Sequence, residues 1–269
     1  MDGGGIYIYL SNNSEVNSSI FTLNSAIVNG GGIAIINSNN SRVNSSTFTK
    51  NLAQNVAGGI YFQESIFSEV NLSTFTENSA NNNGGGIYFN ILCSSEISNT
   101  TFSRNIVIGS GTGESLVVLN NNSLSLNNIT LLKKNSSKRG VAKTLGSTIN
   151  ITNSLFVCEN VSDTMFNTMT GVNLLTGGNI LYSAMSDPMM TKFSTSTNMF
   201  INTGLASTIL NLTLVNNGGL TQTHALVSGS PAIDFSKPIA TTVDQRGAPA
   251  VGVRDCGSFE FNGIVPPTP

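Results

Sequence analysis

The acidic and basic residues that could do chemistry gather near the C-terminal end of the sequence. Asp234, Asp244, Arg246 and Asp255 fall in the motifs GSPAID, VDQRG and DCGSFEF. Two carboxyl groups at a suitable separation can hydrolyse a glycosidic bond, so these four residues form an alternative catalytic site. The interpretation that we favour is a structural network that satisfies backbone groups where a stack of strands ends.

The remaining charged residues offer weaker candidates. His224 is the single histidine, and without a partner serine or cysteine motif it is weak evidence for a triad, so we predict a structural role. Glu15, Arg42, Glu69 and Glu96 recur every 27 residues, which suggests a solvated column with an ion trio rather than a cation site.

Two further groups of reactive side chains indicate no cofactor. The cluster Lys133, Lys134, Lys138 and Arg139 contains no aromatic residue, so we predict a solvated loop rather than a polyanion site. The cysteines Cys93, Cys158 and Cys256 form no CxxC pair, and we expect neither disulfides nor zinc. We therefore predict no metal and no cofactor.

A strict repeat must position all of these residues. Phe21, Phe48, Phe75 and Phe102 lie 27 residues apart and begin the tetrads FTLN, FTKN, FTEN and FSRN. A glycine precedes an isoleucine at the same interval, from Gly5 to Gly86. A fixed period of this length indicates one structural unit stacked on copies of itself.

Apolar columns within the repeat predict short strands. Residues alternate at period two after each glycine cluster, and the composition is poor in helix formers. Continued at 27 residues, the columns place Glu114, Leu124 and Ile129 in the fifth row and Val141, Ile151 and Phe156 in the sixth. We predict an all-β fold, a single-stranded right-handed parallel β-helix of about 27 residues per coil, with three strands per coil and a C-terminal capping segment.

The conserved register of this pattern within the chain predicts ladders of identical side chains. We expect the phenylalanines of the four tetrads to stack, since equivalent residues in successive coils lie about 4.8 Å apart. A stacked amide can donate to one coil and accept from another, so we also expect an asparagine ladder. Its members are Asn24, Asn51, Asn78 and Asn105.

Composition limits the possible partners. The chain has 269 residues, of which 10% are charged, and its net charge of −2 gives no general attraction to nucleic acid or anionic membrane. No apolar run is long enough to span a bilayer as a helix. The sequence opens at Asp2 inside a repeat and shows no export signal, so we expect a partial product.

Three segments follow from the decay of the repeat. We assign residues 1–180 to coils, residues 181–262 to irregular final coils and a C-terminal cap, and residues 263–269 to a proline-rich tail.

The motifs carry a family resemblance that covers most of residues 3–261. The GGGI and FxxN elements resemble the repeats of polymorphic outer-membrane proteins, and GSPAID, DQRG and DCGSFEF resemble the closing segment of secreted β-helix proteins of the choice-of-anchor type. The resemblance implies a right-handed β-helix that is secreted or displayed on a cell surface, in some members for adhesion. This chain lacks the export signal and the anchor of those proteins.

Two functions therefore remain open. The first is a non-enzymatic, adhesin-like or surface-structural monomer that binds an extracellular glycan or host protein through its coil faces. The alternative is a polysaccharide lyase or glycoside hydrolase, because the architecture resembles that of pectin-degrading enzymes. The scarcity of aspartate in the first six rows favours the non-enzymatic function.

Overall fold

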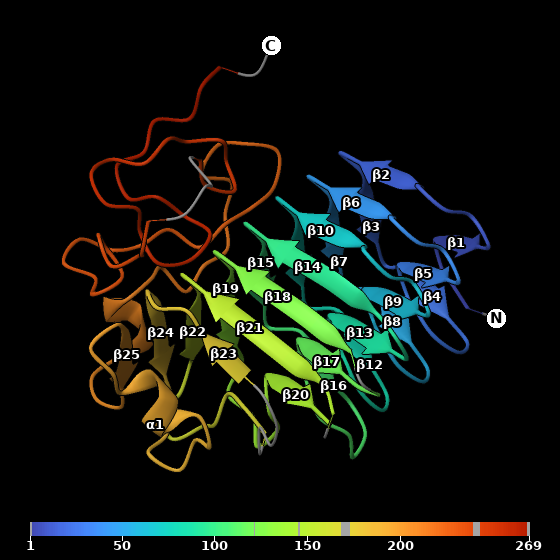
Figure 1. Ribbon diagram of the computed structural model, residues 1–269, viewed down its shortest axis with the longest axis horizontal. Helices are drawn as coiled ribbons and strands as arrows, with labels where there is room; N and C mark the ends of the chain where they lie inside the picture. Colours follow the sequence, from blue (N-terminus) through green and yellow to red (C-terminus); the bar gives the residue numbers. More distant parts are fainter. Residues whose placement is uncertain (1, 121, 145, 168–172, 239–242, 268–269) are drawn as a thin grey trace.

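The chain folds as a parallel β-solenoid (Figure 1). The computed structural model describes residues 2–267 apart from 121, 145, 168–172 and 239–242. All the paired strands are parallel, and each pairs with its counterpart in the next coil. This confirms the predicted fold class and the coil of about 27 residues. Part of the predicted proline-rich tail, residues 268–269, lies outside the described residues.

Four sheets run along the solenoid, one more than the three strands per coil that the sequence predicts. Sheet A contains β1 (Ile6–Tyr9), β5 (Ile33–Ile36), β9 (Ile60–Gln63), β13 (Ile87–Asn90), β17 (Leu116–Val118) and β20 (Val141–Lys143). Sheet B contains β2 (Glu15–Asn17), β6 (Arg42–Asn44), β10 (Glu69–Asn71), β14 (Ser94–Ser98), β18 (Ser123–Asn127), β21 (Thr148–Thr152) and β23 (Asn173–Leu175).

The other two sheets differ greatly in width. Sheet C contains β3 (Ile20–Thr22), β7 (Thr47–Thr49), β11 (Thr74–Thr76), β15 (Thr101–Ser103), β19 (Thr130–Lys133), β22 (Leu155–Cys158), β24 (Asn179–Tyr182) and β25 (Asn198–Ile201). Sheet D contains β4 (Ser25–Ala26), β8 (Leu52–Ala53), β12 (Ser79–Ala80) and β16 (Ile106–Val107). The strands of sheet D are only two residues long, and they coincide with the alanine and valine column that ends each repeat.

The inner core consists of stacked columns. The ring centroids of Phe48 and Phe75 lie 4.6 Å apart and nearly parallel, and those of Phe75 and Phe102 lie 5.1 Å apart. A Cβ atom at Gly32 would come within 2.8 Å of both the Gly59 carbonyl oxygen and the Phe48 ring, so the glycine column permits the close approach of successive coils.

The predicted register is wrong in the fifth coil. Phe102 pairs with Leu131, 29 residues later, and Leu131 pairs with Phe156, 25 residues later. Leu131 therefore replaces the predicted Ile129. In the same way Leu126 replaces Leu124, and Leu116 replaces Glu114. The shift is two residues, which preserves the side-chain alternation of every strand, and the sixth coil returns to the predicted columns.

The C-terminal segment lies along the outside of sheet C, next to β19, β22 and β24 (Figure 1). There it forms a second, outer core. Leu155, Val157 and Ile180 from the strands pack against the segment, which contributes a set of apolar residues. Its fully or nearly buried members are Ala206, Ile209, Leu210, Leu226, Ala232, Cys256 and Phe259.

The end of the inner core is closed by a different element. The helix α1 (Met190–Phe193) places the Phe193 ring 6.1 Å from Phe156 and 5.9 Å from Phe166. A short 3-10 helix, η1 (Ala206–Thr208), begins the passage to the outer core.

Candidate functional site

The predicted ladder residues form continuous chains of contacts in the inner coils. The Asn51 side chain donates from Nδ2 to Asn78 Oδ1 at 2.9 Å and to the Phe21 carbonyl at 2.9 Å. Asn78 makes the equivalent bonds to Asn105 and to Phe48. Asn51, Asn78 and Asn105 are buried, so these amides bond to the chain itself rather than to a ligand.

The alternative catalytic residues of the C-terminal segment are divided by the structure. Asp244 and Arg246 form a buried pair at 2.7 Å, and the Arg246 guanidinium lies 3.8 Å from the centre of the Phe259 ring. Asp234 is exposed, whereas Asp255 is buried and accepts a hydrogen bond from the Asp234 backbone N–H at 2.8 Å.

Backbone groups occupy the oxygens of the buried carboxylates. Asp244 accepts from the N–H groups of Ala248 and Glu260 at 2.9 Å each, and Asp255 also accepts from the Phe261 N–H. Burial raises the pKa of Asp255 to about 6, although these hydrogen bonds oppose the shift. The network was expected at the end of the stack. It lies instead beside sheet C, because the outer core carries the segment along the side.

His224 joins the C-terminal segment to sheet C. Its Nδ1 lies 2.8 Å from the Asn211 carbonyl oxygen and its Nε2 lies 3.0 Å from Ser103 Oγ. Burial lowers the pKa of His224 to about 4, and the nearby Arg104 lowers it further. The imidazole is therefore neutral at pH 7 and bridges two elements.

The column of charged residues on sheet B is exposed to solvent. Arg42 lies 3.7 Å from Glu15 and 3.2 Å from Glu69, and the side chains keep about half of their surface. Glu69 and Glu96 are register neighbours on β10 and β14. Asn127 Nδ2 donates to Glu96 Oε1 at 2.8 Å.

The basic cluster is not wholly the solvated loop that the sequence predicts. Lys133 is fully buried, and its Nζ lies 3.1 Å from Asp163 and 3.9 Å from Glu114. Its position in β19 leaves it between sheet C and the loop that follows, where the Ser136 carbonyl also accepts from Nζ at 2.8 Å. Buried charges need partners of this kind.

The cysteines and the remaining ionisable groups indicate no reactive centre. All three cysteines are free and buried, and burial raises the pKa of Cys93 to about 11. The described part of the chain contains no group of three histidine, cysteine or acidic side chains placed to hold a metal ion. Among these residues no helix has the length and apolar character to cross a membrane.

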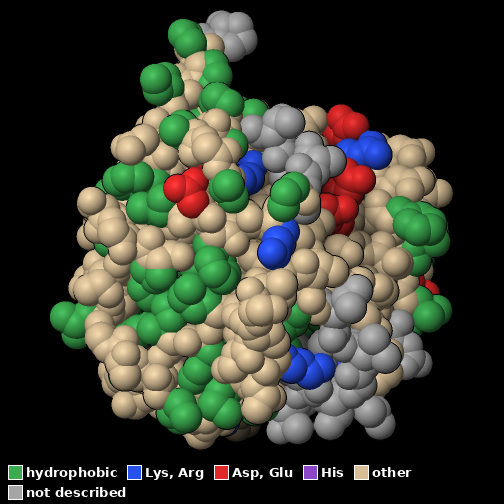
Figure 2. Space-filling view, turned by 60° about the vertical axis from the view of Figure 1, so that its left-hand side comes forward, with side chains coloured by type: hydrophobic (Ala, Val, Ile, Leu, Met, Phe, Trp, Pro, Cys, Tyr) green, Lys and Arg blue, Asp and Glu red, His purple; other side chains and the backbone are tan. Residues whose placement is uncertain are grey.

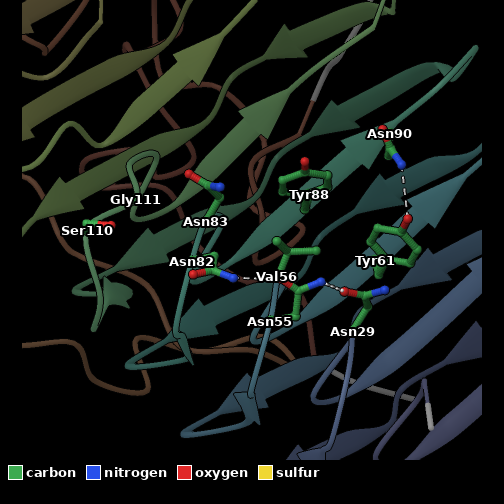
Figure 3. A pocket seen from close by; sticks show the side chains of 10 residues that line it. All are labelled: Asn29, Asn55, Val56, Tyr61, Asn82, Asn83, Tyr88, Asn90, Ser110 and Gly111. Atoms are coloured by element: carbon green, nitrogen blue, oxygen red, sulfur yellow. Dashed lines mark hydrogen bonds between the residues drawn. The ribbon is translucent and has the colours of Figure 1, made fainter.

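A polar groove lies at the corner between sheet D and the outer face of sheet A (Figure 3). Its volume of about 370 Å³ is within the range of small-ligand sites. Asparagines from successive coils form one side, and tyrosines from β9 and β13 form the floor with Val56. The lining residues are Asn29, Asn55, Val56, Tyr61, Asn82, Asn83, Tyr88, Asn90, Ser110 and Gly111.

The groove contains a second amide ladder, which we call the groove ladder: Asn29, Asn55 and Asn82. Asn82 Nδ2 donates to Asn55 Oδ1 at 2.7 Å, and Asn55 Nδ2 donates to Asn29 Oδ1 at 2.9 Å. An amide has two N–H donors and an oxygen with two lone pairs. Asn55 therefore keeps one donor and one lone pair after making both bonds, and a ligand in the groove can use them.

The floor of the groove is also neutral. Asn90 Nδ2 donates to the Tyr61 hydroxyl at 3.1 Å, and that hydroxyl donates to Gln63 Oε1. Burial raises the pKa of Tyr88 to about 12, and the neighbouring Tyr61 adds to the shift. Both phenols are protonated at neutral pH, and none of the lining residues is ionised.

The sequence analysis did not single out these groove residues. A signal is present: an asparagine stands shortly before each glycine cluster, as Asn29, Asn55 and Asn82–Asn83. Their spacing of 26 and 27 residues is visible in the sequence. Which side of the coil carries an accessible groove depends on the packing of the loops.

Much of the molecular surface has the same uncharged character. The end of the molecule seen in Figure 2 shows isolated acidic and basic side chains among polar and apolar ones. No protein-family model matches the chain, and no curated protein matches it.

Proposed function

We propose that this protein is a non-enzymatic β-solenoid that binds a neutral extracellular glycan through the groove on sheets A and D. The observation that carries the proposal is the uncharged lining of amides and phenols. Sugar hydroxyls are both donors and acceptors, and each amide of the groove ladder offers both functions to them. Buried or aligned polar groups of this kind fix the orientation of a ligand.

The proposal extends to the setting of the protein. The solenoid fold and the motif resemblance support a secreted or cell-surface protein related to polymorphic outer-membrane and choice-of-anchor proteins, with an adhesin-like or structural role. Surface labelling of intact source cells with an antibody to the coils tests this location. Signal only after the cells are permeabilised would contradict it.

A binding screen tests the ligand. Neutral and acidic polysaccharides are compared by affinity electrophoresis, and oligosaccharides of the sugars that bind are titrated by calorimetry. We expect binding to a neutral glycan, and Asn55→Ala to weaken it about tenfold, because one or two hydrogen bonds are lost. Asn44→Ala is the matched control: Asn44 is equally half-buried and belongs to an amide pair, at 3.0 Å from Asn17, on sheet B.

The same screen examines the enzymatic alternative. Cleavage of any glycan, with or without calcium, that disappears in Asp244→Ala would replace the binding proposal with a lyase or hydrolase. Equal loss of binding in Asn55→Ala and Asn44→Ala would show that the groove is not the site.

A further inference from the structure

The groove ends at the one place where the regular coils gain residues. Eight residues, 108–115, connect β16 to β17, whereas six residues, 81–86, connect β12 to β13 in the coil before. This insertion accounts for the 29-residue step from Phe102 to Leu131. Two of its residues, Ser110 and Gly111, line the groove.

The insertion is fixed firmly against the preceding coil. The Gly109 N–H donates to the Asn81 carbonyl at 2.8 Å, and the Thr112 N–H donates to Asn83 Oδ1 at 2.9 Å. Lys138 Nζ donates to the Gly109 carbonyl from the other side. A Cβ atom at Gly111 would meet the Asn82 carbonyl oxygen at 1.3 Å, so the loop passes directly over that backbone.

The groove ladder also has a direction. Each amide donates to the asparagine of the preceding coil, so every amide oxygen is directed toward the following coil. The last one, on Asn82, lies on the side of Ser110 (Figure 3). The groove therefore has acceptors directed toward a wall at this end, and it is lined by Asn55 and Asn29 away from it.

We propose that the groove binds the end of a linear neutral glycan, with the terminal sugar against the loop at Ser110–Gly111. The proposal rests on the proposed function. A wall across the groove stops a chain that would otherwise continue along the solenoid axis. The common direction of the amides gives the chain one preferred orientation, so one of its two ends faces the wall.

The test uses three forms of a linear glucan or mannan oligosaccharide that binds in the screen: unmodified, tagged with a bulky group at the reducing end, and capped at the non-reducing end. Wild-type protein should bind one modified form about tenfold more weakly, because its terminal contacts are lost, and the other within about twofold of the unmodified chain. Equal affinity for all three forms overturns end recognition and leaves the proposed function intact. Failure of every neutral glycan to bind overturns both.

A deletion of Ser110 and Gly111 gives an independent readout, because it restores a 27-residue coil. With the wall removed, the sensitive modified form should bind within about twofold of the unmodified chain. Circular dichroism and urea unfolding confirm that the variant is folded, and Asn44→Ala again serves as the control. A folded deletion variant that still discriminates tenfold between the two ends would contradict the role of the loop.

Discussion

Sheet C has two halves that solve different packing problems with the same coil. In β7 and β11 the sequence Thr-Phe-Thr alternates, with phenylalanine in the inner core and threonine outside. In β22 and β24 the sequences LFVC and NILY do not alternate, because the outer face there is covered by the C-terminal segment. Parallel strands buried on both faces have such continuous apolar runs.

The two halves meet at a polar boundary. Thr74 Oγ1 donates to the Gln222 carbonyl at 2.6 Å, and Gln245 contacts Thr74 and Thr101. The outer core thus holds the segment in place, and hydroxyl and amide groups align its margin on the threonine rows. The comparison shows that one core is enough for the first coils, whereas the last coils depend on both.

The largest expected effect comes from the inner core of the regular half. Phe75→Ala should lower the free energy of unfolding by about 3–5 kcal/mol, because it removes a fully buried ring between two stacked neighbours. Urea unfolding measures the loss. Phe21→Ala is the control, since Phe21 stacks on one neighbour, Phe48, and keeps 7% of its surface. Equal losses at both positions would contradict the stacked core.

A cavity in the outer core should act on one half only. Leu155→Ala is expected to cost about 2–4 kcal/mol, because Leu155 is fully buried under the C-terminal segment. Limited proteolysis should then cut within residues 205–262 before the coils, since local opening follows local stability. Cleavage that begins in the first four coils of this variant would show that the two halves are not separable.

The difference between the halves explains what the sequence could predict. The strict column of phenylalanines from Phe21 to Phe102 predicts the sheets of the regular half, because each side chain needs its equivalent in the next coil. The fifth coil escaped this reasoning. Ile129 and Leu131 are both apolar, and a two-residue shift leaves the alternation unchanged.

The outer core could not be located in the same way. Runs such as LFVC reveal that both faces are buried, but they do not identify the segment that covers them. The buried Lys133 illustrates the limit, since its partners Asp163 and Glu114 come from other coils. The groove depends on loops whose lengths depart from the repeat, and its asparagines resemble many others in the chain.

A pH titration probes the polar boundary between the halves. The pKa of His224 falls from 6.5 to about 4 on folding, so the unfolded chain binds the additional proton between these values. The stability contributed by the neutral imidazole is present above pH 6.5 and is lost as the pH falls toward 4. The expected loss is about 3 kcal/mol at most. Unfolding midpoints in urea from pH 7 to about 4 measure it.

Asp255 changes stability in the opposite direction over an overlapping range. Its pKa is raised from 3.8 to about 6, so its contribution is present below pH 3.8 and is lost as the pH rises through 6. His224→Gln retains a polar side chain and should remove the acid-induced loss, leaving the trend of Asp255. An unchanged pH profile in this variant would show that the histidine does not titrate on unfolding.

The smallest effect is expected on the exposed face of the regular half, where Arg42 lies between Glu15 and Glu69. Glu69→Ala should change the free energy of unfolding by less than about 1 kcal/mol, since water screens the pair. The change should shrink further as salt is added, because exposed charges are screened at short range. Urea unfolding at low and high ionic strength measures both quantities. A loss comparable to that of Phe75→Ala, or one independent of salt, would mean that sheet B contributes a buried interaction and that the polar outer faces of the first coils are not free surfaces.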